Sequence, residues 1–463
     1  MCFLGLAVGI PILQPTALKF GKRFVYLIGT VIVLAASIIG SQAKTVGSID
    51  VYMLLGGIAA APVDTLVEIS STDIFFQHER ASAISWLIFA LYSGSFLGPV
   101  AAGYITTSMG WKWCFYFEII IFAVLLIIQL FYMEDTTFRR DFNEEELEEN
   151  ILKQIHLRDK TPIDTKSKDG AADEVKEVNS TSIAEEDIAS IDESIPKRGY
   201  WSRMRLMEFE YGDLRSWLTI FIRPVYLITF PAVIWGGIIY GAQMMYLSVI
   251  GTSQAQIFSA APYHFQANTI GLTNISVCVG NVIGMYYGGS FVDWSTVWLA
   301  KRNDGVLEPE FRLYSMLIPT VVNAAGLLAY GLGAHYGAHW AVPVIIGQGL
   351  LGVAMTSSGA ICIAYAIDSY QMLASEALVV MLVLRNCIGM SFTFGFQPWL
   401  EASGLKLLTW LVFMLSIFIN GSYILMIKYG KKLRKWTQKR YEKYSDPNFG
   451  ESFLKKNVKE STP

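Results

Sequence analysis

The chain is a series of apolar runs separated by short polar connections. A membrane-spanning helix needs about 20 mostly apolar residues, because it rises about 1.5 Å per residue through a hydrocarbon layer about 30 Å thick. Backbone polar groups inside lipid must be hydrogen-bonded within the protein, so such runs are expected to be helices. We count eleven runs, at 2–18, 24–42, 51–71, 82–107, 113–133, 226–250, 267–289, 313–333, 340–366, 372–396 and 406–429. The sequence therefore predicts an all-α, multi-pass membrane protein.

Charged residues are rare in these runs and concentrated in one stretch. Between Glu134 and Arg215 lie 22 of the 39 acidic and 13 of the 36 basic residues. Only 16% of all residues are charged, against about 25% in soluble domains. The five cysteines are scattered in or beside apolar runs and form no CxxC motif. This composition excludes a soluble enzyme, a nucleic-acid-binding protein and a secreted disulfide-rich domain.

The hydrophilic stretch divides the membrane part into two bundles. Residues 1–135 hold five runs and residues 222–430 hold six. The intervening residues 136–221 are rich in Glu, Lys, Asp, Ser and Thr, a composition that cannot bury enough apolar surface to offset its ordering entropy. We therefore expect an acidic, largely disordered loop between the bundles, and a basic tail at 431–463.

Lysine and arginine are distributed unequally among the connections. Basic residues cluster after the first, seventh and last runs and in the long loop, and Arg80 follows the third. The alternate connections hold at most one lysine each. Because positive residues accumulate on the cytoplasmic side of a membrane, we expect the long loop and the carboxyl terminus to be cytoplasmic.

Short motifs carry a resemblance to a known transporter family. Residues 18–23 (LKFGKR) follow the first run, and residues 289–293 (GSFVD) end the seventh. Both are similar to the loop motif G-x-x-x-D-R-x-G-R-R of the major facilitator superfamily. Residues 94–103 (GSFLGPVAAG) match most of the helix-5 signature of its antiporters. The resemblance implies the major facilitator fold, with two helical bundles, and identifies the runs as helices 2 to 12 of the usual twelve, without helix 1.

Within this superfamily the chain resembles the fungal drug:proton antiporters, and most of all the yeast subgroup associated with histidinol and polyamine transport. The likeness rests on residues 61–70 (APVDTLVEIS) and 73–80 (DIFFQHER). Two positions depart from the family pattern. Leu18 stands where the loop motif has aspartate, and Met53 stands where helix 4 has an arginine linked to proton movement. Proton coupling is therefore not implied by the helix-4 motif.

Asp64 and Glu68 are the strongest candidates for a substrate site. A carboxylate at the bilayer centre costs about 2.5–3.5 kcal/mol and persists where it faces a cavity or a partner. The two residues are four positions apart, so they share one helix face. Such a face suits an amine or organic cation that is exchanged for protons. The alternative is that either acid pairs with a basic residue and only stabilises packing.

Arg385 lies in the middle of the tenth run, where an arginine needs a partner or water. It can bind an anionic substrate, or it can form an ion pair across the two bundles. Asn274 and Gln348 are intramembrane amides that can hydrogen-bond a ligand or a neighbouring helix. Tyr240 is one of several aromatic residues that offer a ring face to a cation.

A second set of residues is assigned to conformational change rather than to substrate binding. Small residues in the fourth run allow helices of the two bundles to cross closely. Basic and acidic residues at the cytoplasmic ends can bind helix termini and close a gate. The set comprises Gly21, Lys22, Arg23, Asp73, Arg80, Gly94, Gly98, Pro99, Gly103, Gly289 and Asp293.

The sequence thus predicts a monomeric secondary active transporter of the plasma membrane that moves an amine or organic cation by alternating access with proton coupling. We expect no enzymatic activity, cofactor, metal site or nucleic-acid partner, because no HExxH, GxSxG or Walker motif is present. Two alternatives remain open. One is a transporter of a neutral or anionic solute that uses Arg385, and the other is a receptor-like or truncated member that does not transport.

Overall fold

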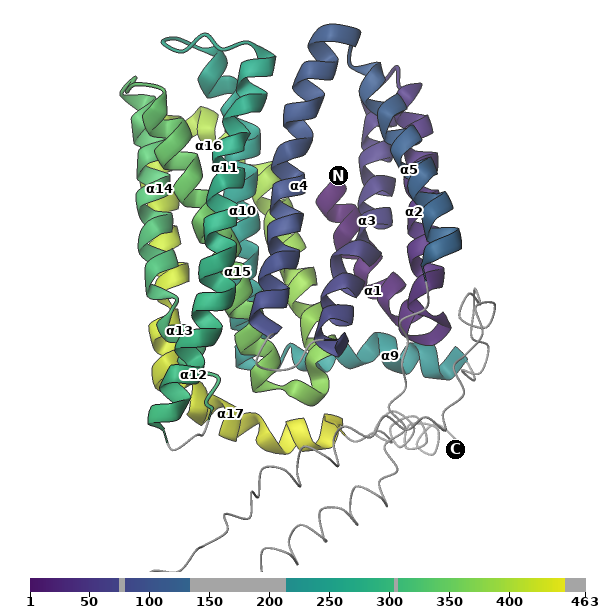
Figure 1. Cartoon of the computed structure of the whole chain (residues 1–463), viewed down its shortest axis with the longest axis vertical. Coiled ribbons are helices and arrows are strands. Elements are labelled where there is room, and N and C mark those ends of the chain that lie inside the picture. The colour runs from purple at the N-terminus through teal and green to yellow at the C-terminus, as the bar shows by residue number, and fades with distance from the viewer. Residues whose placement is uncertain (75–79, 134–213, 304–306, 446–463) are drawn as a thin grey trace, which may run out of the picture. The chain divides into compact units, whose positions relative to one another are not determined.

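A computed structural model describes residues 1–74, 80–133, 214–303 and 307–445, leaving aside the side chains at 18, 68–74, 80–81, 214–220 and 445. The described residues contain helices and no strand, which confirms the predicted all-α class (Figure 1). All eleven predicted runs fall on helices. The sixth run was predicted to begin at residue 226, but its helix begins at Pro231, because residues 228–229 form a turn.

The first bundle contains five helices joined by short connections. They are α1 (Cys2–Phe20), α2 (Lys22–Ser41), α3 (Val46–Ile74), α4 (Arg80–Met109) and α5 (Lys112–Tyr132). Helix α3 packs against both α1 and α2, and α2 packs against α5. No residue of α5 is buried, and its composition is strongly apolar, as expected for a helix that faces lipid.

The second bundle follows α9 (Leu214–Leu227) and is interrupted by two π-helices. Its elements are α10 (Pro231–Ser259), α11 (Ala267–Tyr286), η1 (Tyr287–Phe291), α12 (Val292–Arg302), α13 (Phe311–Tyr314), α14 (Leu317–His335), η2 (Val342–Gln348), α15 (Gly349–Ser369), η3 (Gln371–Leu373), α16 (Ala374–Gly421) and α17 (Tyr423–Ser445). Helix α15 is the centre of the core, because nearly all its residues from Leu351 to Asp368 are buried.

Helix α16 contains both of the last predicted spans. Its regular geometry is broken at Gly404, which has φ 71° and ψ 160°. A residue with a Cβ rarely adopts this positive φ, so the glycine permits the reversal between the two spans. Within the described residues, nine helical segments are long and apolar enough to cross a membrane, the last of them holding both halves of α16, and Cys2–Ala17 is a shorter apolar helix.

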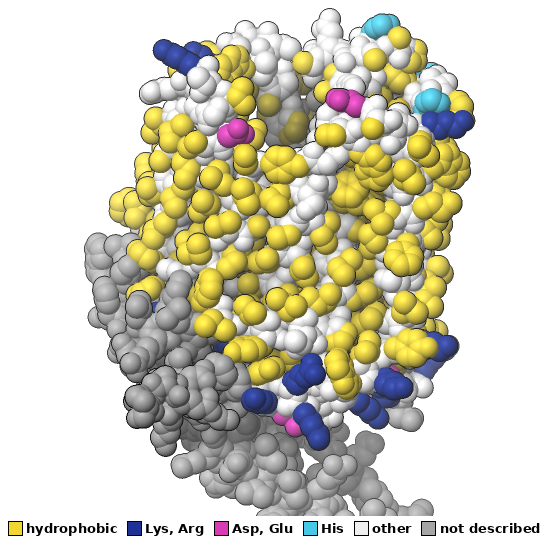
Figure 2. Space-filling model, turned by 180° about the vertical axis from the view of Figure 1, so that it is seen from behind, with side chains coloured by type: hydrophobic (Ala, Val, Ile, Leu, Met, Phe, Trp, Pro, Cys, Tyr) yellow, Lys and Arg dark blue, Asp and Glu magenta, His cyan; other side chains and the backbone are white. Residues whose placement is uncertain are grey.

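Lys and Arg side chains gather at the lower end of the surface, below a wide apolar belt (Figure 2). Helices α9, α12, α13 and α17 lie at this end (Figure 1), which we call the basic end. Helix α17 is attached there by two ion pairs, Arg434 Nη2–Glu310 Oε2 at 2.5 Å and Lys431 Nζ–Glu308 Oε1 at 2.6 Å. The distribution fits a membrane protein with one strongly basic face.

Candidate functional site

A buried ion pair joins the two bundles. Arg385 of α16 donates from Nη2 to Asp64 Oδ2 of α3, and the two side chains are 0% and 6% exposed. Arg385 Nη1 donates to the hydroxyl of Tyr240, in α10, at 2.8 Å. The guanidinium carbon also lies 4.7 Å from the centroid of the Tyr240 ring. The tyrosine therefore binds the same cation through its hydroxyl and its ring face.

The pair lies well inside the length of the helices that carry it. Asp64 is ten residues before the end of α3, and Arg385 is eleven residues after the start of α16. At about 1.5 Å per residue, both lie roughly 15 Å from those helix ends, half the thickness of a hydrocarbon core. A lone charge at this depth is costly, so each residue is stabilised by the opposite charge of the other.

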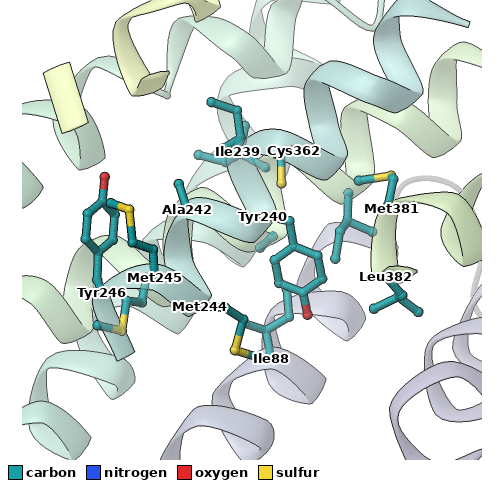
Figure 3. Packing of buried hydrophobic residues seen from close by; sticks show 14 of the residues in the cluster. Ile88, Ile239, Tyr240, Ala242, Met244, Met245, Tyr246, Cys362, Met381 and Leu382 are labelled. Carbon is teal, nitrogen blue, oxygen red and sulfur yellow. The ribbon is translucent and has the colours of Figure 1, made fainter. Parts of the chain in front are cut away.

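The surroundings of Tyr240 are apolar and come from both bundles. Figure 3 shows its ring beside Ile88 of α4, Met244 of α10 and Leu382 of α16. Tyr240 itself is fully buried. Such a setting has a low effective dielectric constant, in which a charged hydrogen bond is stronger than in water and an unpaired charge is more costly.

The predicted amides lie elsewhere. Asn274 donates to Gly271 O at 3.2 Å, within α11, and Gln348 Oε1 is 3.5 Å from Ser276 Oγ, between η2 and α11. Among the described residues, the buried Asn274 Oδ1 and Gln348 Nε2 have no hydrogen-bond partner. A ligand role for these two amides therefore stays a prediction.

Three predicted side chains fall outside the described part of the structure. Glu68 and Asp73 belong to α3, and Arg80 begins α4, but only their backbone is described. In the described residues no group of three or more His, Cys, Asp or Glu side chains could hold a metal ion.

A second polar contact joins the bundles at the basic end. Asp293 Oδ2, in α12, accepts hydrogen bonds from the backbone N–H and the hydroxyl of Ser82, both at 3.0 Å. Ser82 is in the first turn of α4, where backbone N–H groups lack helical partners and the helix dipole favours an anion. Asp293 Oδ1 accepts from Arg312 Nη1 at 2.7 Å, and Arg312 Nε donates to Asp368 Oδ2 at 2.7 Å.

Sequence reasoning missed Arg312 and Asp368 as parts of this contact. Arg312 is one of the basic residues that follow the seventh run, yet it is 2% exposed, and Asp368 is buried at the end of α15. The sequence signal that could have revealed this contact is Asp368, an acidic residue just after the apolar run 340–366. Predicted Gly289 lies beside the same contact, since a Cβ at this position would come within 3.0 Å of Ser82 Cα.

Gly21, Lys22 and Arg23 connect helices of the first bundle. Gly21 joins α1 to α2 with φ 101°, a backbone conformation that favours glycine. Lys22 and Arg23 are buried, and Arg23 Nη2 donates to Leu130 O at 2.7 Å. Leu130 lies in the last turn of α5, so the arginine binds a helix C-terminus.

The small residues of α4 divide into two groups. Pro99 and Gly103 pack against α11, since a Cβ on Gly103 would lie 3.2 Å from Ala267 O and one on Gly271 would lie 3.1 Å from Pro99 O. Gly94 and Gly98 are exposed, with nothing described within 4 Å of an added Cβ. Close packing between the bundles therefore involves only the second half of the motif.

Replacement of Tyr240 by phenylalanine is expected to lower the thermal stability of the purified protein. The ring would remain, but one buried guanidinium N–H would lose its acceptor, and a hydrogen bond to a charged group is worth about 1.5–3 kcal/mol. Tyr246→Phe is the matched control, because the Tyr246 hydroxyl accepts a neutral bond from Asn420 Nδ2 at 3.1 Å. Equal losses of melting temperature in the two variants would contradict a charged interaction at Tyr240.

Comparison with known proteins defines the family. The Major Facilitator Superfamily profile matches residues 1–371, and the chain belongs to this family. The predicted resemblance to the major facilitator superfamily, and the fold that it implies, are thereby confirmed. The protein is a secondary transporter that spans the membrane several times and binds a small-molecule substrate, and it is not an enzyme.

The chain is similar to fungal transporters. The chain is 31% identical over 452 residues to an uncharacterized MFS-type transporter of Schizosaccharomyces pombe, covering 92% of this chain and 76% of the relative. It is 28% identical over 471 residues to Protein HOL1 of Saccharomyces cerevisiae, covering 95% and 80%. Among solved structures, the proton:xylose symporter XylE superposes with a TM-score of 0.58 at 14% identity, covering 92% and 84% of the two chains. The last likeness concerns the fold alone.

Proposed function

We propose that this transporter moves a small amine or organic cation by alternating access and exchanges it for protons at Asp64. The single observation that supports the proposal is the buried Asp64–Arg385 pair between the bundles. Because Arg385 occupies the carboxylate, a cationic substrate must displace it. The sequence alone left open whether Asp64 faces a cavity or pairs with a basic residue, and the proposal now includes Arg385 as its resident counter-ion.

Three cations compete for one carboxylate in this mechanism. Arg385, a proton and the substrate each neutralise Asp64, and none can share its oxygens fully with another. Protonation of Asp64 therefore releases a bound cation, and cation binding opposes protonation, which couples the two by mutual exclusion. Tyr240 supports the exchange, because its ring and hydroxyl continue to bind the guanidinium when Asp64 turns away.

The described contacts support a conformation that is closed at the basic end. Ser82 binds Asp293 there, and Gln14 Nε2 of α1 lies 3.5 Å from Ser375 O of α16. Figure 2 shows the surface hollowed at the opposite end. Because positive residues accumulate on the cytoplasmic side of a membrane, we propose that the basic end is cytoplasmic and that this conformation faces outward. We further propose that the protein lies in the plasma membrane and functions as a monomer.

The alternative of an anionic substrate requires Arg385 to be its ligand. Both terminal nitrogens of Arg385 are already bound, one to Asp64 and one to Tyr240. An anion would have to displace a carboxylate from the same bundle interface and leave Asp64 buried without its cation, which is unfavourable. A neutral solute carries no charge that could replace Asp64 or Arg385 in the ion pair.

Flux measured in proteoliposomes tests the proposal. Purified protein is reconstituted with a pH gradient, and uptake of radiolabelled spermidine, succinate and glucose is compared. We expect spermidine uptake that depends on the gradient and falls at least tenfold in Asp64→Asn. Glu118→Gln is the control, since Glu118 is another intramembrane acid but its described partners, Tyr52 at 3.0 Å and Ser37, both belong to the first bundle.

Other results of the flux measurement would favour one of the alternative functions. Uptake of succinate or glucose in place of spermidine would replace the cation proposal by the anionic or neutral alternative. Absence of flux for every solute class, with correctly folded protein, would favour a receptor-like member that does not transport. Equal spermidine flux in Asp64→Asn and the unmodified protein would remove Asp64 from the mechanism.

A further inference from the structure

An aromatic groove lies between α12 and α13 at the basic end, away from the Asp64–Arg385 pair. Its cavity is about 360 Å³. One wall is formed by Phe291, Trp294 and Trp298, and the other by Tyr314, Leu317 and Ile318. These side chains are between 42% and 62% exposed, although each is large and apolar. The groove opens on the outer surface of the second bundle, where a membrane protein contacts lipid.

The few polar groups of the groove are already bound to one another. Ser295 Oγ lies 3.2 Å from Ser315 Oγ and donates to Val292 O at 2.9 Å. The hydroxyl of Tyr287 donates to Ser315 O at 2.8 Å. The groove therefore presents carbon surface to an occupant, and an apolar chain fits it better than a polar solute does.

Two basic residues stand at the mouth of the groove. Lys301 and Arg302 end α12, and both are exposed. The Arg302 guanidinium stacks on the Trp298 ring at 3.7 Å, so it is held against the wall of the groove. Among the described residues, no acidic side chain pairs with either of them. Arg302 lies one helical turn beyond Trp298, toward the basic end.

An apolar groove with aromatic walls, followed by basic residues, is the arrangement expected at a membrane interface. Trp and Tyr rings collect at the level of lipid headgroups, with acyl chains on one side and charge on the other. Basic residues next to a membrane attract anionic lipids. We propose that the groove binds an anionic phospholipid, with one acyl chain between the aromatic walls and the phosphate at Lys301 and Arg302.

Occupancy of the groove is linked to the contact between the bundles. One wall belongs to η1 and to α12, which carries Asp293, and the other belongs to α14 and to α13, which carries Arg312. The side chains of Asp293 and Arg312 are 2.7 Å apart. The π-helix η1 lies behind the groove and contacts α4 at Gly289. Interrupting π-turns of this kind are frequent at functional sites. A bound lipid would therefore favour the arrangement of α12 and α13 in which Asp293 binds Ser82.

Photo-cross-linking tests the site without any assumption about the transported substrate. The full chain is placed in nanodiscs with a trace of phosphatidylserine or phosphatidylcholine that carries a diazirine in one acyl chain, and the labelled peptides are identified by mass spectrometry. We expect labelling of residues 287–302 and 311–318, with phosphatidylserine preferred. Each basic residue near a membrane surface contributes roughly fivefold, so Lys301→Gln/Arg302→Gln should reduce the preference about 5- to 30-fold.

A second variant separates the groove from the charges. Ile318→Trp places a bulkier side chain in the groove, which narrows it and should reduce labelling of these peptides by both lipids. The controls are Lys406→Gln and Trp410→Ala, which alter an exposed lysine and a 40% exposed tryptophan near the opposite end and should leave the labelling unchanged. The proposal would be overturned if both lipids label these peptides equally and if neither Lys301→Gln/Arg302→Gln nor Ile318→Trp changes the labelling. That result would indicate only nonspecific contact with surrounding lipid.

Discussion

Replacement of Arg385 by methionine is expected to abolish transport and to lower the free energy of unfolding by about 3–5 kcal/mol, the usual cost of removing one partner of a buried pair. The loss arises because Asp64 would remain buried in a membrane-spanning helix without its cation. Methionine matches the length and apolar character of the arginine stem, so packing is largely retained. Thermal unfolding in detergent and uptake in proteoliposomes measure the two effects.

A neutral double variant distinguishes the structural role of the pair from its role in transport. Asp64→Asn combined with Arg385→Met removes both charges, and neutral replacements of buried pairs are often tolerated. We expect the double variant to recover most of the stability lost in Arg385→Met while its transport stays at background. Recovery of transport as well would mean that the pair only holds the bundles together, and the exchange mechanism at Asp64 would have to be abandoned.

Replacement of Asp293 by alanine is expected to shift the protein toward conformations that are open at the basic end. The variant removes the acceptor for both Ser82 donors and for Arg312 Nη1, while Arg312 keeps Asp368. A hydrogen bond to a charged group contributes about 1.5–3 kcal/mol, so losing one corresponds to roughly a 10- to 100-fold change in the conformational equilibrium.

Spin labels at the opposite end report this shift. Met109 ends α4 of the first bundle and Tyr336 follows α14 of the second, and both are exposed. Opening at the basic end should shorten the distance between labels at these two positions. Glu308→Gln is the control, because Glu308 binds Lys431 within the second bundle. An unchanged distance distribution in Asp293→Ala would show that this carboxylate does not hold the bundles together.

The sequence predicted the helices well because apolar length alone specifies a membrane span. It could not place Pro231 as the start of the sixth span, since apolar composition continues through residues 226–231. It did leave residues 397–405 between its last two spans, and the break at Gly404 falls there. The π-helices η1 and η2 were also invisible, because a single extra residue per turn leaves the apolar pattern almost unchanged.

The candidate site was predicted residue by residue but not as an assembly. Asp64 and Arg385 were found separately because a charge in an apolar run is conspicuous. Their pairing depends on how α3 and α16 are rotated and packed, which a pattern within each run does not specify. Arg312 and Asp368 escaped notice because charges at the edge of a run are common. Asn274 and Gln348 have the right chemistry for a ligand, and in the described part of the chain each keeps one buried amide atom without a hydrogen-bond partner, so their role stays a prediction.

The ion pair also cannot form during synthesis until long after Asp64 has been made. Asp64 and Arg385 are 321 residues apart, and a ribosome adds about 5–20 residues per second. The aspartate therefore enters the translocon roughly 15–60 s before the arginine is made. During that interval it must be protonated, remain near the lipid headgroups or be sheltered by insertion factors. The first bundle thus cannot reach its final arrangement in the membrane until the second has been synthesised.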